Sequence, residues 1–239
     1  MGAVAVQAVL RRAFARWGRP ERLRVDNGTP WGATGGLPTA LALWVAGLDV
    51  ELVRNHAHRP QENGVAERSQ GVSAAWAEPG TCADAAALQQ RLHEEDRIQR
   101  EVYPSVDGRS RWHTYPALCH SGRGYAAGVE ALLWSLAQAL AYLARYRVRR
   151  TVAPSGKVSL YDRGHMVGTE YRGQVVYVSL EDVPGAWVFR DREDRELRRR
   201  PAEELTQENI IALSIARQRG SSRRGKTLCP EVAAKLCVR

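Results

Sequence analysis

Two carboxylates with different local surroundings are the clearest candidates for chemistry in this sequence. Asp26 follows the short apolar run Leu23–Val25 and begins an Asp-Asn-Gly turn, which places its carboxylate at the carboxyl end of a strand. Glu67 follows Asn63 and Gly64, a pair that opens a helix, so its side chain lies on the first turns of that helix. A strand end and a helix face can bring two acids to one hard cation. We therefore predict that Asp26 and Glu67 share a metal site.

Carboxylates that hold magnesium are suited to phosphodiester chemistry, because two metal ions neutralise the negative oxygens that shield the phosphorus and activate the nucleophile and the leaving oxygen. Each motif also has a plainer interpretation. The Asp26–Gly28 turn by itself is most often structural, and Glu67 beside Arg68 by itself is most often a solvated helix face. Glu62 is a rival for the second acid, but it precedes the helix start and we assign it to the loop.

The elements that must position these acids follow one another in α/β order. Apolar residues recur at helical spacing in the first 17 residues, and Gly18 with Pro20 ends that run. Short apolar runs bounded by turn residues predict the strands. The predicted elements of this half are a helix Ala3–Trp17, a strand Leu23–Val25, a helix Leu37–Leu48, a strand Val50–Val53, a loop His56–Asn63, a helix Gly64–Trp76 and a long helix Asp84–Val102.

The second half of the chain has a different apolar period. Residues 103–125 are rich in Pro, Gly and Arg and predict an extended linker, after which Gly128–Tyr142 predicts a helix. Between residues 147 and 200 the apolar period becomes two, and turns with glycine separate the runs, which predicts a small antiparallel barrel. A terminal helix Thr206–Arg217 and a basic tail of low order from Gly220 follow. The expected fold class is α/β followed by a small all-β barrel.

The composition limits the partners of this protein. The 239 residues carry a formal net charge of +9, mostly from arginine, which favours a polyanion such as nucleic acid; a solvated basic surface is the plainer alternative. No run is long enough to cross a bilayer, so we expect a soluble, cytoplasmic protein. Reduced thiols are expected because no zinc-site spacing occurs among the four cysteines, Cys82, Cys119, Cys229 and Cys237.

Three segments carry a family resemblance: Arg24–Gly28, Pro60–Arg68 and Tyr103–Arg111. Together they resemble bacterial insertion-sequence transposases with the integrase catalytic core, and the likeness spans most of the chain. The resemblance implies a ribonuclease H-like core whose Asp, Asp, Glu triad binds two Mg²⁺ or Mn²⁺ ions for DNA cleavage and strand transfer. By motif match, Asp26 stands where the second Asp belongs and Glu67 where the Glu belongs.

The chain departs from this family at the first acid. The family's leading Asp lies on an opening strand, upstream of the helix that here begins almost at Met1. Residues 1–25 contain no Asp, and Glu21 in the turn after the helix cannot replace it. We therefore expect residues 1–102 to be an N-terminally truncated core that is inactive alone. Three explanations fit the missing part: a misplaced start codon, a decayed gene, or a part that another chain supplies. The competing hypothesis is a non-catalytic DNA-binding remnant that modulates full-length transposase.

The resemblance extends to the strands, which look like the small C-terminal barrel of the same transposases, a domain implicated in DNA binding. The expected regions are a linker with a helix at 103–145, the barrel at 146–204, and a terminal helix with the tail at 205–239. Basic residues of the barrel would contact phosphates, although interleaved acids leave solubility or local ion pairs as an alternative. Aromatic residues beside the linker arginines favour stacking on DNA, with packing against a domain as the alternative. The predicted DNA contacts are Arg109, Arg111, Arg147, Arg149, Arg150, Lys157 and Arg172.

Histidines supply two weaker candidates. His56 and His58 flank the approach to Glu67 and could orient a phosphate or the attacking water, although loop histidines are more often incidental. A loose cluster without a second pair of ligands does not predict zinc; its members are His113, Cys119 and His120. The expected partners are transposon ends and target DNA in the nucleoid, together with further copies of this chain or full-length transposase.

Overall fold

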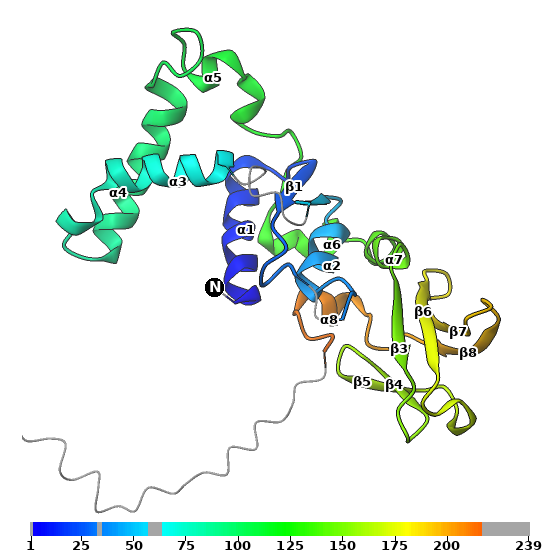
Figure 1. Ribbon diagram of the computed structural model, residues 1–239. Coiled ribbons are helices and arrows are strands. Elements are labelled where there is room, and N and C mark those ends of the chain that lie inside the picture. The colour runs from blue at the N-terminus through cyan, green and yellow to red at the C-terminus, as the bar shows by residue number, and fades with distance from the viewer. Residues whose placement is uncertain (1, 33–34, 57–63, 217–239) are drawn as a thin grey trace, which may run out of the picture.

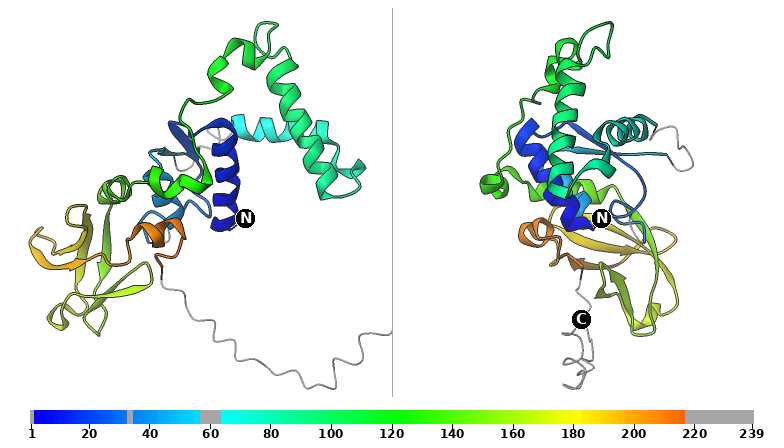
Figure 2. Two further views of the ribbon diagram at one scale, coloured as in Figure 1. Left: turned by 180° about the vertical axis from the view of Figure 1, so that it is seen from behind. Right: turned by 90° about the vertical axis from the view of Figure 1, so that its left-hand side faces the viewer.

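The computed structural model describes residues 2–32, 35–56 and 64–216, which form a mixture of helices and strands. Figure 1 shows three regions. The central part contains residues 2–56 and 119–146, the helical arm contains residues 64–118, and the strand half contains residues 147–201. Figure 2 shows, from two further sides, that the helical arm projects away from the other two regions.

The central part begins with the predicted α/β order. Helix α1 (Ala3–Trp17) is followed by β1 (Arg22–Val25), α2 (Ala40–Gly47) and β2 (Glu51–Arg54). The two strands pair in parallel, with register Arg22↔Glu51 to Val25↔Arg54. Helix α2 is buried from Leu41 to Gly47 because it is apolar on every side, which is typical of a helix in the middle of a core.

The predicted helix Gly128–Tyr142 is wrong as a single element, because the chain breaks at Trp134 between α6 (Glu130–Leu133) and α7 (Leu136–Ala144). The Trp134 indole donates a hydrogen bond to the Trp44 carbonyl at 2.9 Å. It lies so close to Gly47 that a Cβ there would collide with it. Docking of this indole onto α2 interrupts the helix, and Ser135 then caps α7 by accepting from the Gln138 N–H.

The helical arm consists of α3 (Gly64–Ala77), α4 (Ala85–Arg97), which runs into the π-helical turn Ile98–Val102, and α5 (Arg111–Thr114). The predicted long helix Asp84–Val102 is thus present as α4 and the π-helical turn that follows it. The expected extended linker is partly wrong, since α5 and the 3₁₀ turn Pro116–Leu118 form within it. Arg100 holds the base of the arm against α1, where its guanidinium lies 4.9 Å from the centre of the Trp17 ring.

The strand half contains an antiparallel sheet of order β3-β6-β7-β8 and a separate hairpin, β4-β5. Both sheets are open, so the expected closed barrel is wrong. Along the described strands, the β8 main chain pairs with β7 alone. The guanidinium groups of Arg198 and Arg200 instead donate to the carbonyls of Val167 and Met166, at 3.0 and 2.9 Å. Side chains thus connect β8 to the hairpin where a barrel would have ladder hydrogen bonds. The bounds are β3 (Arg147–Thr151), β4 (Lys157–Leu160), β5 (Arg163–Met166), β6 (Val175–Glu181), β7 (Ala186–Arg190) and β8 (Glu196–Pro201).

One hydrophobic cluster runs from Phe14 in α1 to Ile215 near the end of the described chain, and it joins the central part to the strand half. The final helix, α8 (Gln207–Ile211), is shorter than predicted, because Leu213 adopts a left-handed conformation with φ of 55°. Arg217, where the predicted helix ends, lies outside the described residues. Within the residues described, no single helix is both long and apolar enough to span a membrane.

Candidate functional site

Asp26 lies directly after β1, at the edge of the sheet where both parallel strands end. Its side chain is exposed, and Oδ1 accepts a hydrogen bond from the Gly28 N–H at 3.1 Å. The neighbouring Asn27 amide donates to the Asn55 carbonyl at 2.8 Å and so ties the two strand ends together. Ligands of open α/β sheets bind at the carboxyl ends of the strands. The local fold therefore presents the Asp26 carboxylate where chemistry is expected.

Glu67 lies on the first turn of α3, as predicted, and its side chain is exposed. The segment that connects β2 to α3 contains His58 and Glu62 and lies outside the described residues, whereas His56 is exposed at the end of β2. The hydrogen bonds and ion pairs found within the described ranges do not join Asp26 to Glu67. A shared site for the two carboxylates therefore stays a prediction.

The donor chemistry at this edge suits magnesium. Asp26 Oδ2 makes no hydrogen bond with any described residue, so this oxygen can bind a cation while Oδ1 holds the turn. Magnesium is usually held by one or two carboxylates together with substrate phosphates, which fits Asp26 and Glu67. No group of three or more His, Cys, Asp or Glu residues with the spacing of a metal site occurs in the described part of the chain. A pair of metal ions would need a further acid.

The three arginines of β3 have different surroundings. Arg147 pairs with Asp194 at 2.7 Å, and its guanidinium lies 4.8 Å from the centre of the Tyr177 ring. Arg149 is exposed and forms no ion pair with a described residue. Arg150 faces the central part, where it donates to the Gly35 carbonyl at 2.6 Å. Of these three cations, Arg149 is the one whose guanidinium has neither an ion pair nor a hydrogen bond with a described residue.

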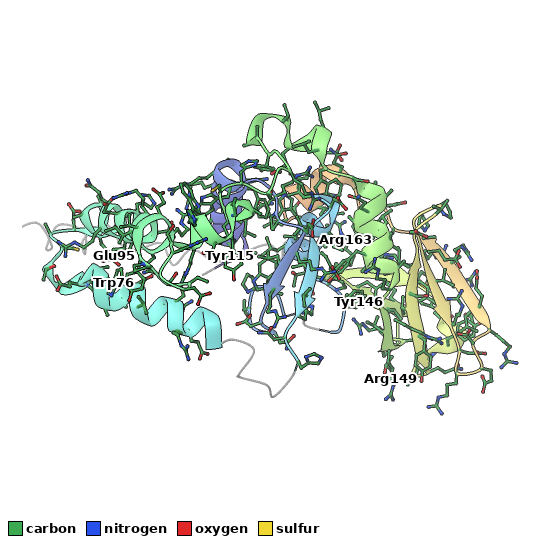
Figure 3. All side chains as sticks on the ribbon, turned by 90° about the horizontal axis from the view of Figure 1, so that it is seen from above. Trp76, Glu95, Tyr115, Tyr146, Arg149 and Arg163 are labelled. Atoms are coloured by element: carbon green, nitrogen blue, oxygen red, sulfur yellow. The ribbon has the colours of Figure 1, made fainter. Side chains whose placement is uncertain are left out.

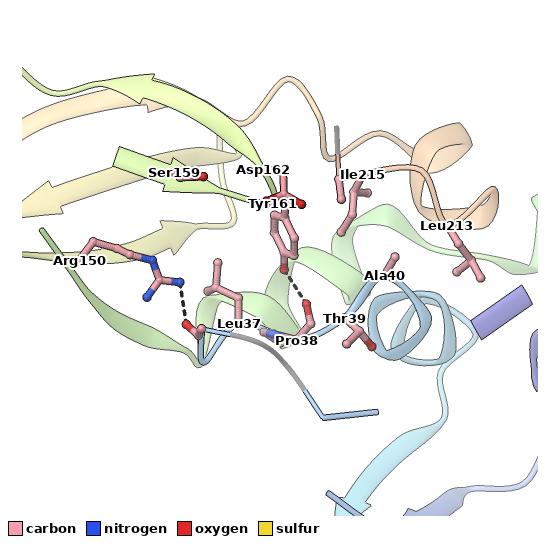
Figure 4. A pocket seen from close by; sticks show the side chains of 12 residues that line it. Leu37, Pro38, Thr39, Ala40, Arg150, Ser159, Tyr161, Asp162, Leu213 and Ile215 are labelled. Carbon is pink, nitrogen blue, oxygen red and sulfur yellow. Dashed lines mark hydrogen bonds between the residues drawn. The ribbon is translucent and has the colours of Figure 1, made fainter. Parts of the chain in front are cut away.

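Figure 4 shows the hydrogen bond from Arg150 to the Gly35 carbonyl, at a cavity between the strand half and the segment that precedes α2. Across this cavity the Tyr161 hydroxyl donates to the Pro38 carbonyl at 2.8 Å, and burial raises the pKa of Tyr161. Arg150 and Tyr161 thus fasten residues 35–38 to the strand half. Phosphate contact by Arg150 stays a prediction.

The remaining predicted DNA contacts lie on two regions. Lys157, at the start of β4, is exposed and forms no ion pair with the described part of the chain, and Arg172 is exposed while donating to the Thr169 carbonyl at 3.1 Å. Arg109 and Arg111 are exposed on the helical arm instead. Figure 3 shows the helical arm, where Trp76 is labelled, and the strand half, where Arg149 is labelled, on opposite sides of the central part. The predicted contacts therefore do not form one continuous patch.

Sequence reasoning missed a free cation of the strand half. Arg192 lies in the turn between β7 and β8, exposed and without an ion pair to any described residue. Nearby arginines are neutralised, since Arg195 pairs with Asp191 at 2.8 Å and Arg199 pairs with Glu181. The signal in the sequence is weak, because all of these arginines alternate with acids. Only the observed partners separate the free cations from the paired ones.

Sequence reasoning also missed two buried carboxylates that have hydrogen-bond partners, Glu130 and Glu204. Glu130 accepts two hydrogen bonds from Arg11, at 2.9 and 2.6 Å, and one from the Tyr125 hydroxyl. Glu204 accepts from the Trp187 indole at 2.8 Å and lies 3.4 Å from His165 Nε2. Burial would raise the pKa of each carboxyl, but these partners outweigh burial and hold the pKa of both below its usual value. Both groups join elements of the fold.

A search of this chain against models of known protein families finds no match.

Proposed function

We propose that this chain is part of a DNA strand-transfer enzyme of the integrase-core transposase type, with a partial ribonuclease H-like core. The observation that carries the proposal is the parallel pairing of β1 with β2, which exposes Asp26 at the carboxyl edge of the sheet. The helix of Glu67, α3, is the next helix after β2. This is the strand-then-helix placement of acids that the motif resemblance implies. The basic net charge of the chain supports a polyanionic substrate.

In this proposal each acid holds a divalent cation against the scissile phosphodiester. The bound cation would neutralise charge on the phosphate oxygens. Its turn holds Asp26 for this role, because the Gly28 N–H binds Oδ1 of this exposed side chain while Oδ2 accepts no hydrogen bond from a described residue. A triad would need a third carboxylate from outside residues 1–25, which contain no aspartate. We therefore expect this chain alone to bind metal weakly and to join no DNA strands.

Paramagnetic broadening by Mn²⁺ tests the metal site without requiring activity. In NMR spectra of the chain with end DNA, Mn²⁺ is expected to broaden the amide signals of residues 26–28 and of residues 64–68 together. Asp26→Asn should weaken the apparent affinity for Mn²⁺ by about tenfold or more, since one of two carboxylate ligands is lost. Glu21→Gln, which removes another exposed acid of the central part, should change nothing. Broadening of only one of the two segments would refute a shared site.

The second candidate function is DNA binding without catalysis, and the free cations of the strand half favour it. Arg149, Lys157 and Arg192 are exposed and form no ion pair with described residues. Each cation that contacts a phosphate contributes about one unit to the slope of log affinity against log salt. Arg149→Ala and Lys157→Ala should each lower that slope by about one for duplex DNA, whereas the paired Arg195→Ala should leave it unchanged.

A strand-transfer assay with labelled end DNA and Mg²⁺ tests whether this chain alone is active. Joined product that disappears with Asp26→Asn would establish catalysis by this chain. Duplex binding with the expected salt dependence, and no joined product, is the result that both candidates expect of this chain alone, and the Mn²⁺ experiment then separates them: broadening of both segments supports the metal site, whereas broadening of neither supports the binding module. Absence of both duplex binding and joining would refute both.

A further inference from the structure

The helical arm contains a cavity that the proposed function does not use. It has a volume of about 700 Å³ and opens between α3, the π-helical turn and α5. Side chains of three kinds line it, namely arginines, aromatic rings and a buried amide. The lining residues that matter here are Arg68, Val72, Trp76, Gln99, Tyr103 and Arg111.

The two aromatic rings form one wall of this cavity. Trp76 and Tyr103 meet edge to face, with ring centres 5.4 Å apart and planes at 72°. Trp76 is 38% exposed and Tyr103 49%, which is unusual for residues of this size in a folded chain. Exposed aromatic faces in a cavity are stacking surfaces, and every nucleobase has a face that can stack on them.

The amide of Gln99 provides an unused hydrogen-bond donor. Gln99 is 9% exposed, and its Nε2 is buried without a hydrogen-bond partner among the described residues. A buried donor without a partner is unfavourable, so a turn of this side chain that presents Nε2 to an acceptor in the cavity would be favoured. An apolar side chain from a protein partner would leave this donor unpaired, whereas the edge of a base carries acceptors.

The arginines at the cavity differ from those of the long helix and its π-helical turn. Arg91, Arg97 and Arg100 each pair with a carboxylate on the arm. Arg68 and Arg111 are exposed and, like Arg109, form no ion pair with any described residue. The arm as a whole carries eight acids against six arginines, so free cations at the cavity contrast with its overall negative balance. Their place beside a stacking surface is suited to a phosphate next to a base.

We propose that this cavity binds an unpaired nucleotide, with the base stacked on Tyr103, the more exposed of the two rings, its edge accepting from Gln99, and the adjoining phosphate held by Arg68 and Arg111. The chemistry is the same for a nucleotide within a single strand of DNA and for a free mononucleotide. The choice of DNA as the source rests on the proposed function. The cavity itself does not, because Trp76, Tyr103 and Gln99 are not among the residues predicted to contact DNA; Arg111 is the one residue that belongs to both sets.

Fluorescence anisotropy with three labelled probes tests this: a blunt duplex, the same duplex with one unpaired nucleotide at its end, and a 12-nucleotide oligothymidine. The full chain is expected to bind both unpaired probes through the cavity. Tyr103→Ala and Gln99→Met should each weaken this binding by about tenfold, with duplex binding unchanged. Arg111→Gln should weaken it as well, while Arg91→Gln, an arm arginine outside the cavity that is paired with Glu78, should not. Gln99→Met keeps the volume, and circular dichroism verifies that each variant is folded.

The outcomes distinguish this inference from the proposed function. Oligothymidine binding that needs Tyr103 and Gln99, without any duplex binding, would support the cavity and refute the proposed function. Competition by thymidine monophosphate at similar concentration would support the cavity and identify a free nucleotide as its ligand. Unpaired probes that bind equally well to all cavity variants would overturn the inference. Loss of self-association in Tyr103→Ala, seen by sedimentation with probe binding unchanged, would overturn it in favour of a protein interface.

Discussion

Large apolar side chains are buried in the strand half and exposed in the helical arm. In the strand half, Trp187 and Phe189 are fully buried and belong to the main core. In the arm, the buried residues among the described side chains are Ala77 and two polar residues, Glu95 and Gln99. The large apolar side chains that the arm exposes are Trp76, Val102, Tyr103, Tyr115 and Leu118. The strand half is therefore stabilised by the core that it shares with the central part, whereas the arm is marginal by itself and is suited to a partner.

The largest effect is expected from removing the central tryptophan of the strand half. Trp187→Ala should lower the free energy of unfolding by about 3–5 kcal/mol, because it leaves a cavity and removes the donor to Glu204. Trp76→Ala in the arm should cost about 1 kcal/mol, since that ring is already partly exposed. Urea denaturation measures both. Val183→Ala, at 83% exposure, is the control in the strand half. Equal costs for the two tryptophans would contradict the contrast between the regions.

The next effect concerns the buried ion pair that joins α1 to α6. Arg11→Met should destabilise the central part by about 3 kcal/mol, because Glu130 would remain buried without its cation. The double variant with Glu130→Gln should recover part of this loss, which a double-mutant cycle in thermal unfolding would measure. Arg12→Met, the exposed neighbour on the same helix, should change stability by less than about 0.5 kcal/mol. A cost for Arg12→Met as large as that for Arg11→Met would show that burial of the pair is irrelevant.

Acid should weaken the central part and the strand half through Glu130 and Glu204. Their pKa values lie below the usual 4.5 in the folded chain, so their stabilisation is present above about pH 4.5 and is lost as the pH falls through the folded pKa. Thermal melts from pH 7 to pH 3 should therefore show a drop that begins near pH 4.5. Glu130→Gln should flatten this drop. A drop that is the same in the variant would assign acid sensitivity to other carboxylates.

The smallest effect is expected in the arm and has the opposite sign. Burial raises the pKa of Glu95, whose Oε2 has no hydrogen-bond partner among the described residues, so its ionised form destabilises the arm at neutral pH. The arm should gain stability as the pH falls through the raised pKa, with the gain complete below 4.5. Glu95→Gln should slow hydrogen exchange in α4 at pH 7, after correction for intrinsic rates. Glu94→Gln, which removes an exposed ion pair with Arg97, should not slow it.

Local features of the sequence predicted much of the central part. The helix Ala3–Trp17 is confirmed at both ends, because its apolar spacing and Gly18 determine it without distant contacts. The strand before Asp26 and the helix that begins at Gly64 are confirmed for the same reason. The break at Trp134 could not be predicted, since it depends on docking against Gly47, far away in the chain. The open sheet could not be predicted either, because the alternation of apolar and polar residues identifies strands but not which strands pair with each other.

The sequence by itself determined the kinds of element, the turn that exposes Asp26 and the basic balance of the chain, because spacing and turn chemistry act over a few residues. Only the tertiary structure decided which arginines are free. Arg11 meets a carboxylate 119 positions away, and Arg150 meets a carbonyl 115 positions away. The availability of a charge depends on what folding brings beside it, and these partners lie far beyond the range of any local pattern.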